Sequence, residues 1–476
     1  MKKLLFLIVT LLVPLTVLPA RESSVPPRTD VKPQPRQARD PAGEKAWLAH
    51  GFTETQLESL REAFRWGIES KFIPGGALLV IHRGEPVFRE AFGVANLETK
   101  RPFAVDAPCR IASVTKPHTA TLLALLVDRG KLSWDDPVDK YLPQFAKVTI
   151  RGKVPASRPP KIRELLSHTA GFPGNDERRA GGPGFRMDGT LAQAVDDMAR
   201  AGLATEPGSG FAYTGLGYMV AGRVAEVVTG QEFGALMSER LLKPVGANTA
   251  VFQSAAPEEL KSLMPTRYQR EGGQLVKANS ATDGEGSIAF PSPGGGLVST
   301  LDDVAHVMML HRNRGIVDGK RLIAPEMLQA QYRRQPATGR EGYGLGFNIL
   351  RTDEQGIGDR IRHTGASGTF VVIDFKEDLL VVMLTQVPTK QTQPFGDRLM
   401  KAINSVFSPR YTARHEKQQF CHPHRPAVHA DPTEHQCRRP VRFCQRPAHP
   451  RRGGRPPPLP DFRHQKGWRA ERERIR

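Results

Sequence analysis

Side chains that can build a large hydrophobic core are concentrated in one continuous stretch of this 476-residue chain, residues 47–408. The 68 residues after it contain only seven valine, isoleucine, leucine or phenylalanine residues, too few to bury a core of their own. Residues 21–46 hold five prolines among charged and polar residues, a composition typical of an extended linker. The sequence therefore predicts one large domain over residues 47–408 and a basic, disordered Arg/Pro/His-rich tail over residues 409–476.

The net charge of +19 belongs mostly to that tail. Residues 409–476 carry 17 basic and 6 acidic side chains, whereas residues 47–408 carry 43 and 39. A domain that binds nucleic acid presents a basic surface to it. Because the predicted domain is nearly neutral, we expect no nucleic-acid partner. Binding of a polyanion by the tail is an alternative, and so is translation of the tail out of frame.

The first twenty residues have the pattern of a secretory signal peptide. Lys2 and Lys3 precede a short apolar stretch from Leu4 to Leu18, and Ala20 offers a small residue for cleavage. The stretch is shorter than the ~20 residues that a spanning helix needs, although an uncleaved anchor is an alternative interpretation. We therefore expect an exported protein, periplasmic or secreted, with no stable membrane span beyond the signal peptide at residues 1–20.

Three of the four cysteines and half of the histidines fall in the tail, where a metal site is conceivable. Their spacing matches no closed four-ligand pattern such as paired C-x-x-C. We therefore expect neither a metal nor another cofactor, and no feature of the sequence specifies an oligomeric state. The residues that could be interpreted as metal ligands are Cys421, His422, His424, His429, His435, Cys437, Cys444 and His449.

Helical and strand patterns are interspersed within residues 47–408, which predicts an α/β domain. Two apolar or alternating runs, Ala77–Ile81 and Pro86–Phe92, are joined by Arg83-Gly84-Glu85 and predict a β-hairpin. Hydroxyl residues followed by acids predict a helix start at Ser299-Thr300. The other predicted elements are helices over Leu57–Ile68, Thr119–Val127, Tyr218–Val228 and Phe395–Phe407, and strands over Phe370–Asp374 and Leu379–Thr385.

The segment Ser113-Val114-Thr115-Lys116-Pro117 lies immediately before an apolar helix. A spacing of three places Ser113 and Lys116 on one helix face. A serine hydroxyl becomes a strong nucleophile when a base takes its proton, and a lysine in a partly apolar pocket can serve as that base. Pro117 removes one helical hydrogen bond, which helices tolerate chiefly near their start. A capping serine beside an exposed lysine is the alternative for this motif alone.

Two further segments strengthen the catalytic interpretation. Tyr213, in a loop before a predicted helix, can project its phenol toward a neighbouring site and relay protons; a buried aromatic with a satisfied hydroxyl is the alternative. His363-Thr364-Gly365-Ala366 leads into an apolar strand. Its small residues allow a substrate to approach the backbone, and an exposed strand edge can donate to an acyl oxygen.

Together these segments resemble the serine β-lactamase and penicillin-binding superfamily, in its class C β-lactamase branch. That branch includes D-Ala-D-Ala carboxypeptidases, D-aminopeptidases and S-x-x-K carboxylesterases. The resemblance covers roughly residues 50–408 and includes Leu165–Gly171, Gly294–Thr300 and Tyr343–Phe347. It implies an antiparallel sheet flanked by helices, an α+β arrangement, with an all-helical insertion and the site between the two.

The resemblance also implies a role for each residue of the site. Ser113 would be the acylated nucleophile, and Lys116 would accept its proton together with Tyr213. His363, Thr364 and Gly365 would form the third motif. The backbone N–H groups of Ser113 and Ala366 would form the oxyanion hole. The Ser-Val-Thr-Lys-Pro sequence is similar to the esterase members in particular.

Two departures from the family pattern bear on the substrate. Gly215 stands where the second motif, Tyr-x-Asn, has its asparagine, and His363 replaces the usual lysine of the third motif. An unperturbed histidine would lose its attraction for anionic substrates as the pH rises through about 6.5. We therefore expect a carboxylesterase-like hydrolase of small-molecule or peptide acyl substrates. The alternatives are a D-Ala-D-Ala carboxypeptidase or β-lactamase, and an inactive protein that binds cell-wall ligands.

Overall fold

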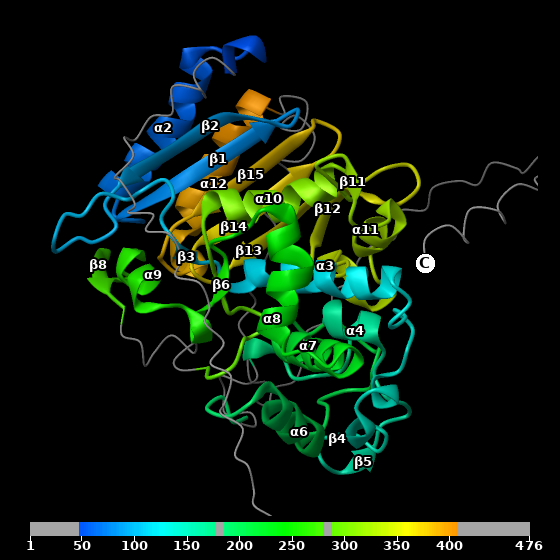
Figure 1. The fold of residues 1–476 in the computed structure, drawn as a ribbon. Coiled ribbons are helices and arrows are strands. Elements are labelled where there is room, and N and C mark those ends of the chain that lie inside the picture. The colour runs from blue at the N-terminus through cyan, green and yellow to red at the C-terminus, as the bar shows by residue number, and fades with distance from the viewer. Residues whose placement is uncertain (1–46, 177–184, 279–287, 408–476) are drawn as a thin grey trace, which may run out of the picture. The chain divides into compact units, whose positions relative to one another are not determined.

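A six-stranded sheet forms the centre of the computed structural model, which describes residues 47–176, 185–278 and 288–407 (Figure 1). In chain order its strands are β1 (Gly75–His82), β2 (Glu85–Gly93), β12 (Asn348–Thr352), β13 (Gly358–Gly365), β14 (Thr369–Asp374) and β15 (Leu379–Leu384). They lie in the order β12-β13-β14-β15-β1-β2, and every neighbouring pair is antiparallel. The predicted signal peptide, linker and tail lie outside the described residues, so those boundaries stay predictions.

The predicted hairpin is confirmed. Strands β1 and β2 pair antiparallel, and two residues, Arg83 and Gly84, connect them. Both have a positive φ, 53° and 88°, which suits the tight two-residue turn that joins twisted strands. The predicted strands near residues 370 and 379 are also confirmed, as β14 and β15.

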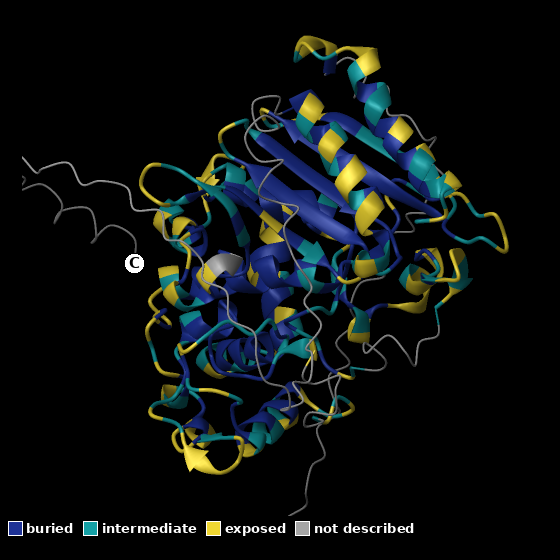
Figure 2. Ribbon diagram, turned by 180° about the vertical axis from the view of Figure 1, so that it is seen from behind, coloured by how far each residue is buried: buried dark blue, intermediate teal, exposed yellow. Residues whose placement is uncertain are grey.

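Both faces of the sheet are covered, because its side chains alternate between two hydrophobic cores. Along β1, Leu78 and Val80 belong to one core, and Leu79 and Ile81 belong to the other. Helices α2 (Glu54–Glu69) and α12 (Thr389–Phe407) cover the first face. Figure 2 shows both helices with exposed outer sides against a buried sheet.

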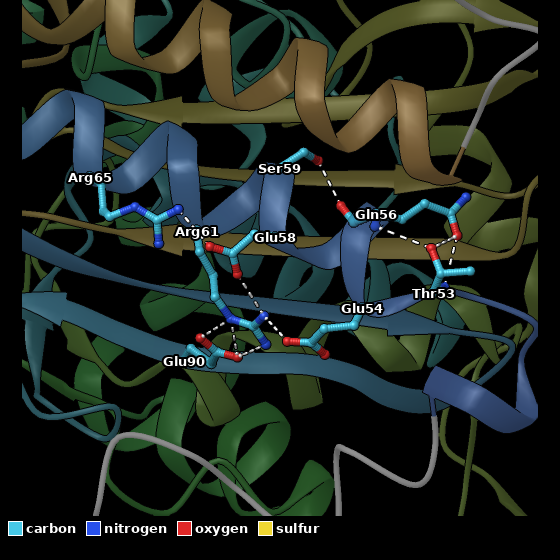
Figure 3. Close-up of polar contacts among 8 residues, drawn as sticks. All are labelled: Thr53, Glu54, Gln56, Glu58, Ser59, Arg61, Arg65 and Glu90. Carbon is cyan, nitrogen blue, oxygen red and sulfur yellow. Dashed lines mark hydrogen bonds and ion pairs between the residues drawn. The ribbon is translucent and has the colours of Figure 1, made fainter.

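Helix α2 is fixed at its start and along its side (Figure 3). The hydroxyl of Thr53 accepts from the backbone N–H of Gln56, and the Gln56 side chain accepts from the backbone N–H of Thr53. Arg61, buried beneath the helix, donates to Glu90 of β2 at 2.6 Å and to Glu54 at 2.6 Å. These charge-assisted bonds set the position of the helix on the sheet.

The second face of the sheet packs against a mostly helical part of the chain. Helix α3 (Thr115–Asp128) lies between the sheet and this part, and it is buried along most of its length (Figure 1). The other helices are α4 (Ile162–Leu166), α6 (Leu191–Ala201), α7 (Leu216–Thr229), α8 (Phe233–Met237), α9 (Glu258–Leu263), α10 (Leu301–Arg312) and α11 (Pro325–Gln331). The arrangement confirms the expected fold class, an antiparallel sheet flanked by helices with a helical insertion.

Short strand pairs complete the fold. They are β3 (Cys109–Arg110), β4 (Thr149–Ile150), β5 (Val154–Pro155), β6 (Val251–Phe252), β7 (Tyr268–Glu271), β8 (Gln274–Lys277), β9 (Leu297–Ser299), β10 (Ile316–Val317) and β11 (Lys320–Arg321). Strands β3, β9 and β6 form a small sheet that leads directly into the segment of Ser113. The helix predicted to begin at about residue 395 begins at Thr389, so Pro394 lies inside it.

Candidate active site

Ser113 and Lys116 meet at the start of helix α3. Ser113 lies in a 3₁₀ turn, Ala112–Val114, and Lys116 lies in the first turn of the α-helix that follows. The Nζ atom of Lys116 is 2.9 Å from the Oγ atom of Ser113, and the lysine side chain is only 2% exposed. The Nζ atom also donates to the carbonyl oxygen of Gly294 at 2.6 Å. A capping serine beside an exposed lysine is therefore wrong as an interpretation of this motif.

Two side-chain hydroxyls hold the backbone before Ser113 by hydrogen bonds. The carbonyl of Arg110 accepts from the Ser367 hydroxyl at 2.6 Å, and the carbonyl of Ile111 accepts from the Thr369 hydroxyl at 3.0 Å. Ala112, next to the serine, has a φ of 44°, a conformation that non-glycine residues seldom adopt. Such strain persists only where the surrounding structure fixes it, and it is frequent at functional sites.

Gly365 lets the end of β13 approach this segment. A Cβ atom on Gly365 would lie 2.3 Å from the carbonyl oxygen of Ile111, so only glycine fits without displacing one of the two backbones. Ala366 follows directly and lines the same cleft as Ser113. Its N–H group has no acceptor within the described parts of the chain. This placement is compatible with the predicted oxyanion role of Ala366.

Tyr213 lies beside the same lysine. The centroid of its ring is 5.0 Å from Lys116 Nζ, and the ring of Tyr218 lies 5.4 Å away from that atom. Two aromatic rings therefore lie next to the Lys116 amine. The structure brings Ser113, Lys116 and Tyr213 together. The proton-relay role of Tyr213 stays a prediction.

His168 positions the segment that carries Tyr213. Its Nδ1 accepts from the backbone N–H of Thr214 at 3.2 Å, and its carbonyl accepts from the N–H of Ala212 at 2.9 Å. The ring of His168 contacts that of Tyr213, with 4.4 Å between centroids. Burial first, and the nearby charge of Lys116 second, hold the pKa of His168 well below its ordinary value. His168 belongs to Leu165–Gly171, a segment of the family resemblance, and its contacts fit a residue that orders this loop.

A cleft of about 840 Å³ opens in front of Ser113, and Lys116 and Ala366 also line it. Ser113 is half-buried and Ala366 is exposed, so both are accessible from the cleft. Gly294, Gly295 and Gly296 line the cleft as well. No three His, Cys, Asp or Glu side chains gather as a metal-ligand set within the described ranges, and the tail residues considered above lie outside them.

Comparisons with known proteins identify the family of this chain. The sequence model of the Beta-lactamase family matches residues 60–404. The chain belongs to the beta-lactamase family. Esterase EstB of Burkholderia gladioli is 30% identical over 337 residues, covering 64% of this chain and 82% of EstB. A putative D-alanyl-D-alanine carboxypeptidase of Escherichia coli (strain K12) is 28% identical over 367 residues, covering 70% and 83% of the two chains.

Solved structures share the fold. EstCE1, described as a hydrolase with promiscuous acyltransferase activity, matches with a TM-score of 0.63 at 24% identity, covering 74% of this chain and 98% of EstCE1. The chain is thus a serine hydrolase of the β-lactamase superfamily, related to esterases and carboxypeptidases. In the part of the chain that the structure describes, no helix is both long and apolar enough to cross a membrane.

His363, predicted to lie in the third motif, is buried and engaged at both ring nitrogens. Nδ1 donates to the carbonyl of Thr364 at 2.9 Å, which leaves Nε2 to accept from the Tyr343 hydroxyl at 2.9 Å. Burial first, and the charge of Lys116 second, lower the pKa of His363 to about 3. The expectation that His363 loses a charge near pH 6.5 is therefore wrong, because the imidazole is already neutral well below that pH. Tyr343 was not identified from the sequence.

Gly215, predicted to stand where the second motif has its asparagine, has open space around it. A Cβ atom on Gly215 would meet no other atom within 4 Å, and the residue lines the cleft. Across the gap, a Cβ atom on Gly294 would lie 3.2 Å from the Gly215 Cα atom. The carbonyl of Gly294 thus contacts Lys116 at a point where no asparagine amide is present.

Proposed function

We propose that this chain is an exported carboxylesterase-like hydrolase that forms an acyl-enzyme on Ser113. The observation that carries the proposal is the 2.9 Å contact between Ser113 Oγ and Lys116 Nζ inside a cleft. A carbonyl oxygen can only accept, so one N–H of the lysine is committed to Gly294. To act as the base, the amine must first lose a proton, which gives it a lone pair for the serine proton.

The reaction would proceed in two halves. Ser113 Oγ attacks the carbonyl carbon of an ester while Lys116, with Tyr213, accepts the hydroxyl proton. The tetrahedral oxyanion receives hydrogen bonds from the N–H groups of Ser113 and Ala366, and its collapse expels the alcohol, which takes up the proton. Water, deprotonated by the same groups, then attacks the acyl-serine, releases the acid and restores the hydroxyl.

Two features of the site favour esters over peptides and β-lactams. Gly215 offers no side-chain amide to a substrate amide, and the neutral His363 offers no charge to a carboxylate at the third motif. Neither change removes the nucleophile or its base. EstB, an esterase, is among the relatives, which supports the same choice. The putative carboxypeptidase relative makes D-Ala-D-Ala hydrolysis the second candidate.

Covalent labelling tests the proposal directly. Purified protein is treated with a fluorescent fluorophosphonate, and hydrolysis of 4-nitrophenyl butyrate, nitrocefin and a D-Ala-D-Ala peptide is measured in parallel. We expect labelling and butyrate hydrolysis in the native protein and in Ser254→Ala, another serine that lines the cleft, but not in Ser113→Ala. Equal labelling of native protein and Ser113→Ala would contradict the proposal. Saturable ligand binding without turnover of any substrate would instead indicate an inactive binding protein.

Export, and the character of the tail, need separate tests. The proposed location, periplasmic or secreted, is supported by the charged and apolar pattern of residues 1–20. Sequencing the N-terminus of the mature protein should show that these residues have been removed. Deleting residues 409–476 should leave esterase activity unchanged, because all the proposed catalytic residues lie within residues 113–366.

A further inference from the structure

Gln386, in the loop between β15 and α12, is a buried glutamine whose side chain binds the backbone just before Ser113. Its Oε1 accepts from the backbone N–H of Arg110 at 3.3 Å, and its Nε2 donates to the carbonyl of Arg110 at 3.1 Å. The Nε2 also donates to the carbonyl of Thr385. One side-chain amide therefore holds both backbone groups of a residue that lies three positions before the proposed nucleophile.

The Gln386 side chain takes the place of a neighbouring strand beside β3. On the other side β3 pairs with β9, and the N–H of Ile111 donates to the carbonyl of Leu297 at 3.0 Å. Successive residues of a strand direct their N–H and C=O groups to opposite sides, so those of Arg110 face away from β9. Gln386 meets them there, together with the Ser367 hydroxyl, which donates to the Arg110 carbonyl at 2.6 Å.

The same loop also holds the segment of Ala366, the second proposed oxyanion donor. The N–H of Thr389, the first residue of α12, donates to the carbonyl of Ala366 at 3.1 Å. The Thr389 hydroxyl accepts from the N–H of Gly368 at 3.1 Å. A Cβ atom on Gly368 would lie 2.3 Å from the carbonyl oxygen of Val387, so the loop and this turn are in close contact. Residues 386–389 thus bind both segments that carry a proposed oxyanion donor.

The loop is anchored outside the site as well. The Thr385 hydroxyl donates to the carbonyl of Gly75 on β1 at 2.7 Å. The carbonyl of Gln386 accepts from the N–H of Tyr268 on β7 at 3.0 Å. Gln386 is therefore fixed on both sides of its own peptide, and its amide reaches Arg110 from a rigid base.

The segment that Gln386 holds is strained. Ala112, between Arg110 and Ser113, has a φ of 44°, and such a conformation persists only where the surrounding structure fixes it. Rotation about the bonds of Ala112 turns the peptide that carries the Ser113 N–H. Release of Arg110 would therefore let Ala112 relax and redirect this donor.

We propose that Gln386 is a positioning residue for the oxyanion hole, which keeps the N–H groups of Ser113 and Ala366 directed at one point. This inference rests on the proposed function and on the oxyanion role of these two groups. Gln386 is not among the described residues that line the cleft, so it acts through the backbone of Arg110 and not by contact with substrate. Donors that are fixed before the reaction stabilise the anion without reorganisation, and a misplacement of about 1 Å can cost about 10²-fold in rate.

A ketone that mimics the tetrahedral intermediate tests this role. In butyl trifluoromethyl ketone, Ser113 Oγ bonds to the carbonyl carbon and the π electrons move to the oxygen, while the serine proton passes to Lys116 with Tyr213. Carbon NMR of the ketone, labelled at its carbonyl carbon, follows ionisation of the hemiketal oxygen with pH. Hydrogen bonds to an anion lower its pKa, so the midpoint of this ionisation reports on the oxyanion donors themselves.

Replacing Gln386 with methionine removes both bonds to Arg110 at similar side-chain volume. We expect kcat/KM for 4-nitrophenyl butyrate to fall about 10²-fold and the hemiketal midpoint to rise by about one pH unit or more. Gln331→Met is the matched control, because Gln331 is a buried glutamine at the end of α11 and is not among the described residues that line the cleft. It should leave kcat/KM and the midpoint unchanged.

If Gln386→Met does not fold, Gln386→Asn replaces it, since the same amide on a shorter side chain cannot reach both groups of Arg110. Both changes should then appear in smaller measure. A native midpoint in the folded Gln386 variant would overturn the inference, even if kcat/KM falls. A native protein that neither hydrolyses butyrate nor is labelled by the fluorophosphonate would instead refute the proposed function.

Discussion

Lys116 bridges two groups, the Oγ of Ser113 at 2.9 Å and the carbonyl oxygen of Gly294 at 2.6 Å. The serine and the glycine are 181 residues apart in the sequence, so the bridge joins the start of α3 to the loop before β9. Thr119 of the same helix strengthens this connection, because its hydroxyl donates to the carbonyl of Pro293 at 2.7 Å. Contacts between α3 and the loop before β9 therefore hold the Lys116 amine beside Ser113.

Replacing Lys116 with methionine should abolish most activity and leave the fold in place. Methionine fills a similar buried volume but has no proton acceptor, and positioned general bases contribute about 10²–10⁴ in rate. The Gly294 carbonyl loses its partner, which costs about 1–3 kcal/mol of stability. We expect kcat for 4-nitrophenyl butyrate to fall at least 100-fold while circular dichroism is unchanged. Lys131→Met, at an exposed position after the same helix, is the control and should retain full activity.

Gly215→Asn should increase reactivity toward β-lactams. The Cβ atom enters open space, and the amide would restore the Tyr-x-Asn pattern. We expect faster acylation by nitrocefin, measured in single-turnover experiments, while butyrate hydrolysis changes only a few-fold. Gly215→Ala introduces the same Cβ atom without the amide. If the alanine variant gains as much as the asparagine variant, the amide is not responsible.

Gly365→Ala should damage catalysis by separating β13 from the nucleophile segment. The added methyl group would lie 2.2 Å from Thr369 Oγ1 and 2.3 Å from the carbonyl oxygen of Ile111, so the strand and Ala366 must shift. Loss of one oxyanion donor costs about 10²–10³ in kcat, and overpacking costs about 1–3 kcal/mol of stability. Gly396→Ala, on α12 with nothing within 4 Å, is the matched control and should be neutral or stabilising. Butyrate kinetics and thermal unfolding of both variants check this; unimpaired kcat in Gly365→Ala would contradict it.

Much of the fold follows from local sequence patterns. The Arg83-Gly84 turn marks the β1–β2 hairpin, and the long apolar stretches mark α3 and α7. The start of α10 is marked by Thr300, whose hydroxyl accepts from the backbone N–H of Asp303. Helix α6 was not predicted, although Thr190 and Gln193 form a capping box at its start. Its buried residues Leu191, Ala194, Val195 and Met198 also follow helical spacing, so both signals for this helix are present in the sequence.

The sequence predicted which side chains form the site, but not their backbone partners or their burial. Ser113 and Lys116 were found because their spacing places them together in any helix start. The partner of Lys116 is a backbone carbonyl, which has no signature in the sequence. The lowered pKa of His363 comes first from burial and second from the charge of Lys116, and both depend on how the chain packs in three dimensions. Tertiary environment, and not residue type, sets these properties.

Four histidines that are at most 2% exposed should make the protein lose stability as the pH falls below about 6.5. Burial is the largest cause that lowers the pKa of each, to about 4 for His118 and about 3 for His311 and His363, and well below the ordinary value for His168. Since the unfolded chain takes up protons near pH 6.5 and the folded chain does not, the stabilisation is complete above pH 6.5. It is lost as the pH falls toward the folded-state values.

Below pH 6.5, each of these histidines should lower the free energy of unfolding by about 1.4 kcal/mol per pH unit. Most carboxylates remain ionised between pH 6.5 and 5, so they add little to this decline. Denaturant unfolding at pH 7.5, 6.5, 5.5 and 5.0 should therefore give a steep decline below pH 6.5 and little change above it. His311→Gln removes one titrating group and should reduce the slope by about 1.4 kcal/mol per pH unit, whatever its effect on stability at pH 7.5. His306→Gln, exposed on the same helix, should leave the slope unchanged. An unaltered slope in His311→Gln would show that this imidazole is already protonated in the folded protein at pH 5, contrary to its burial.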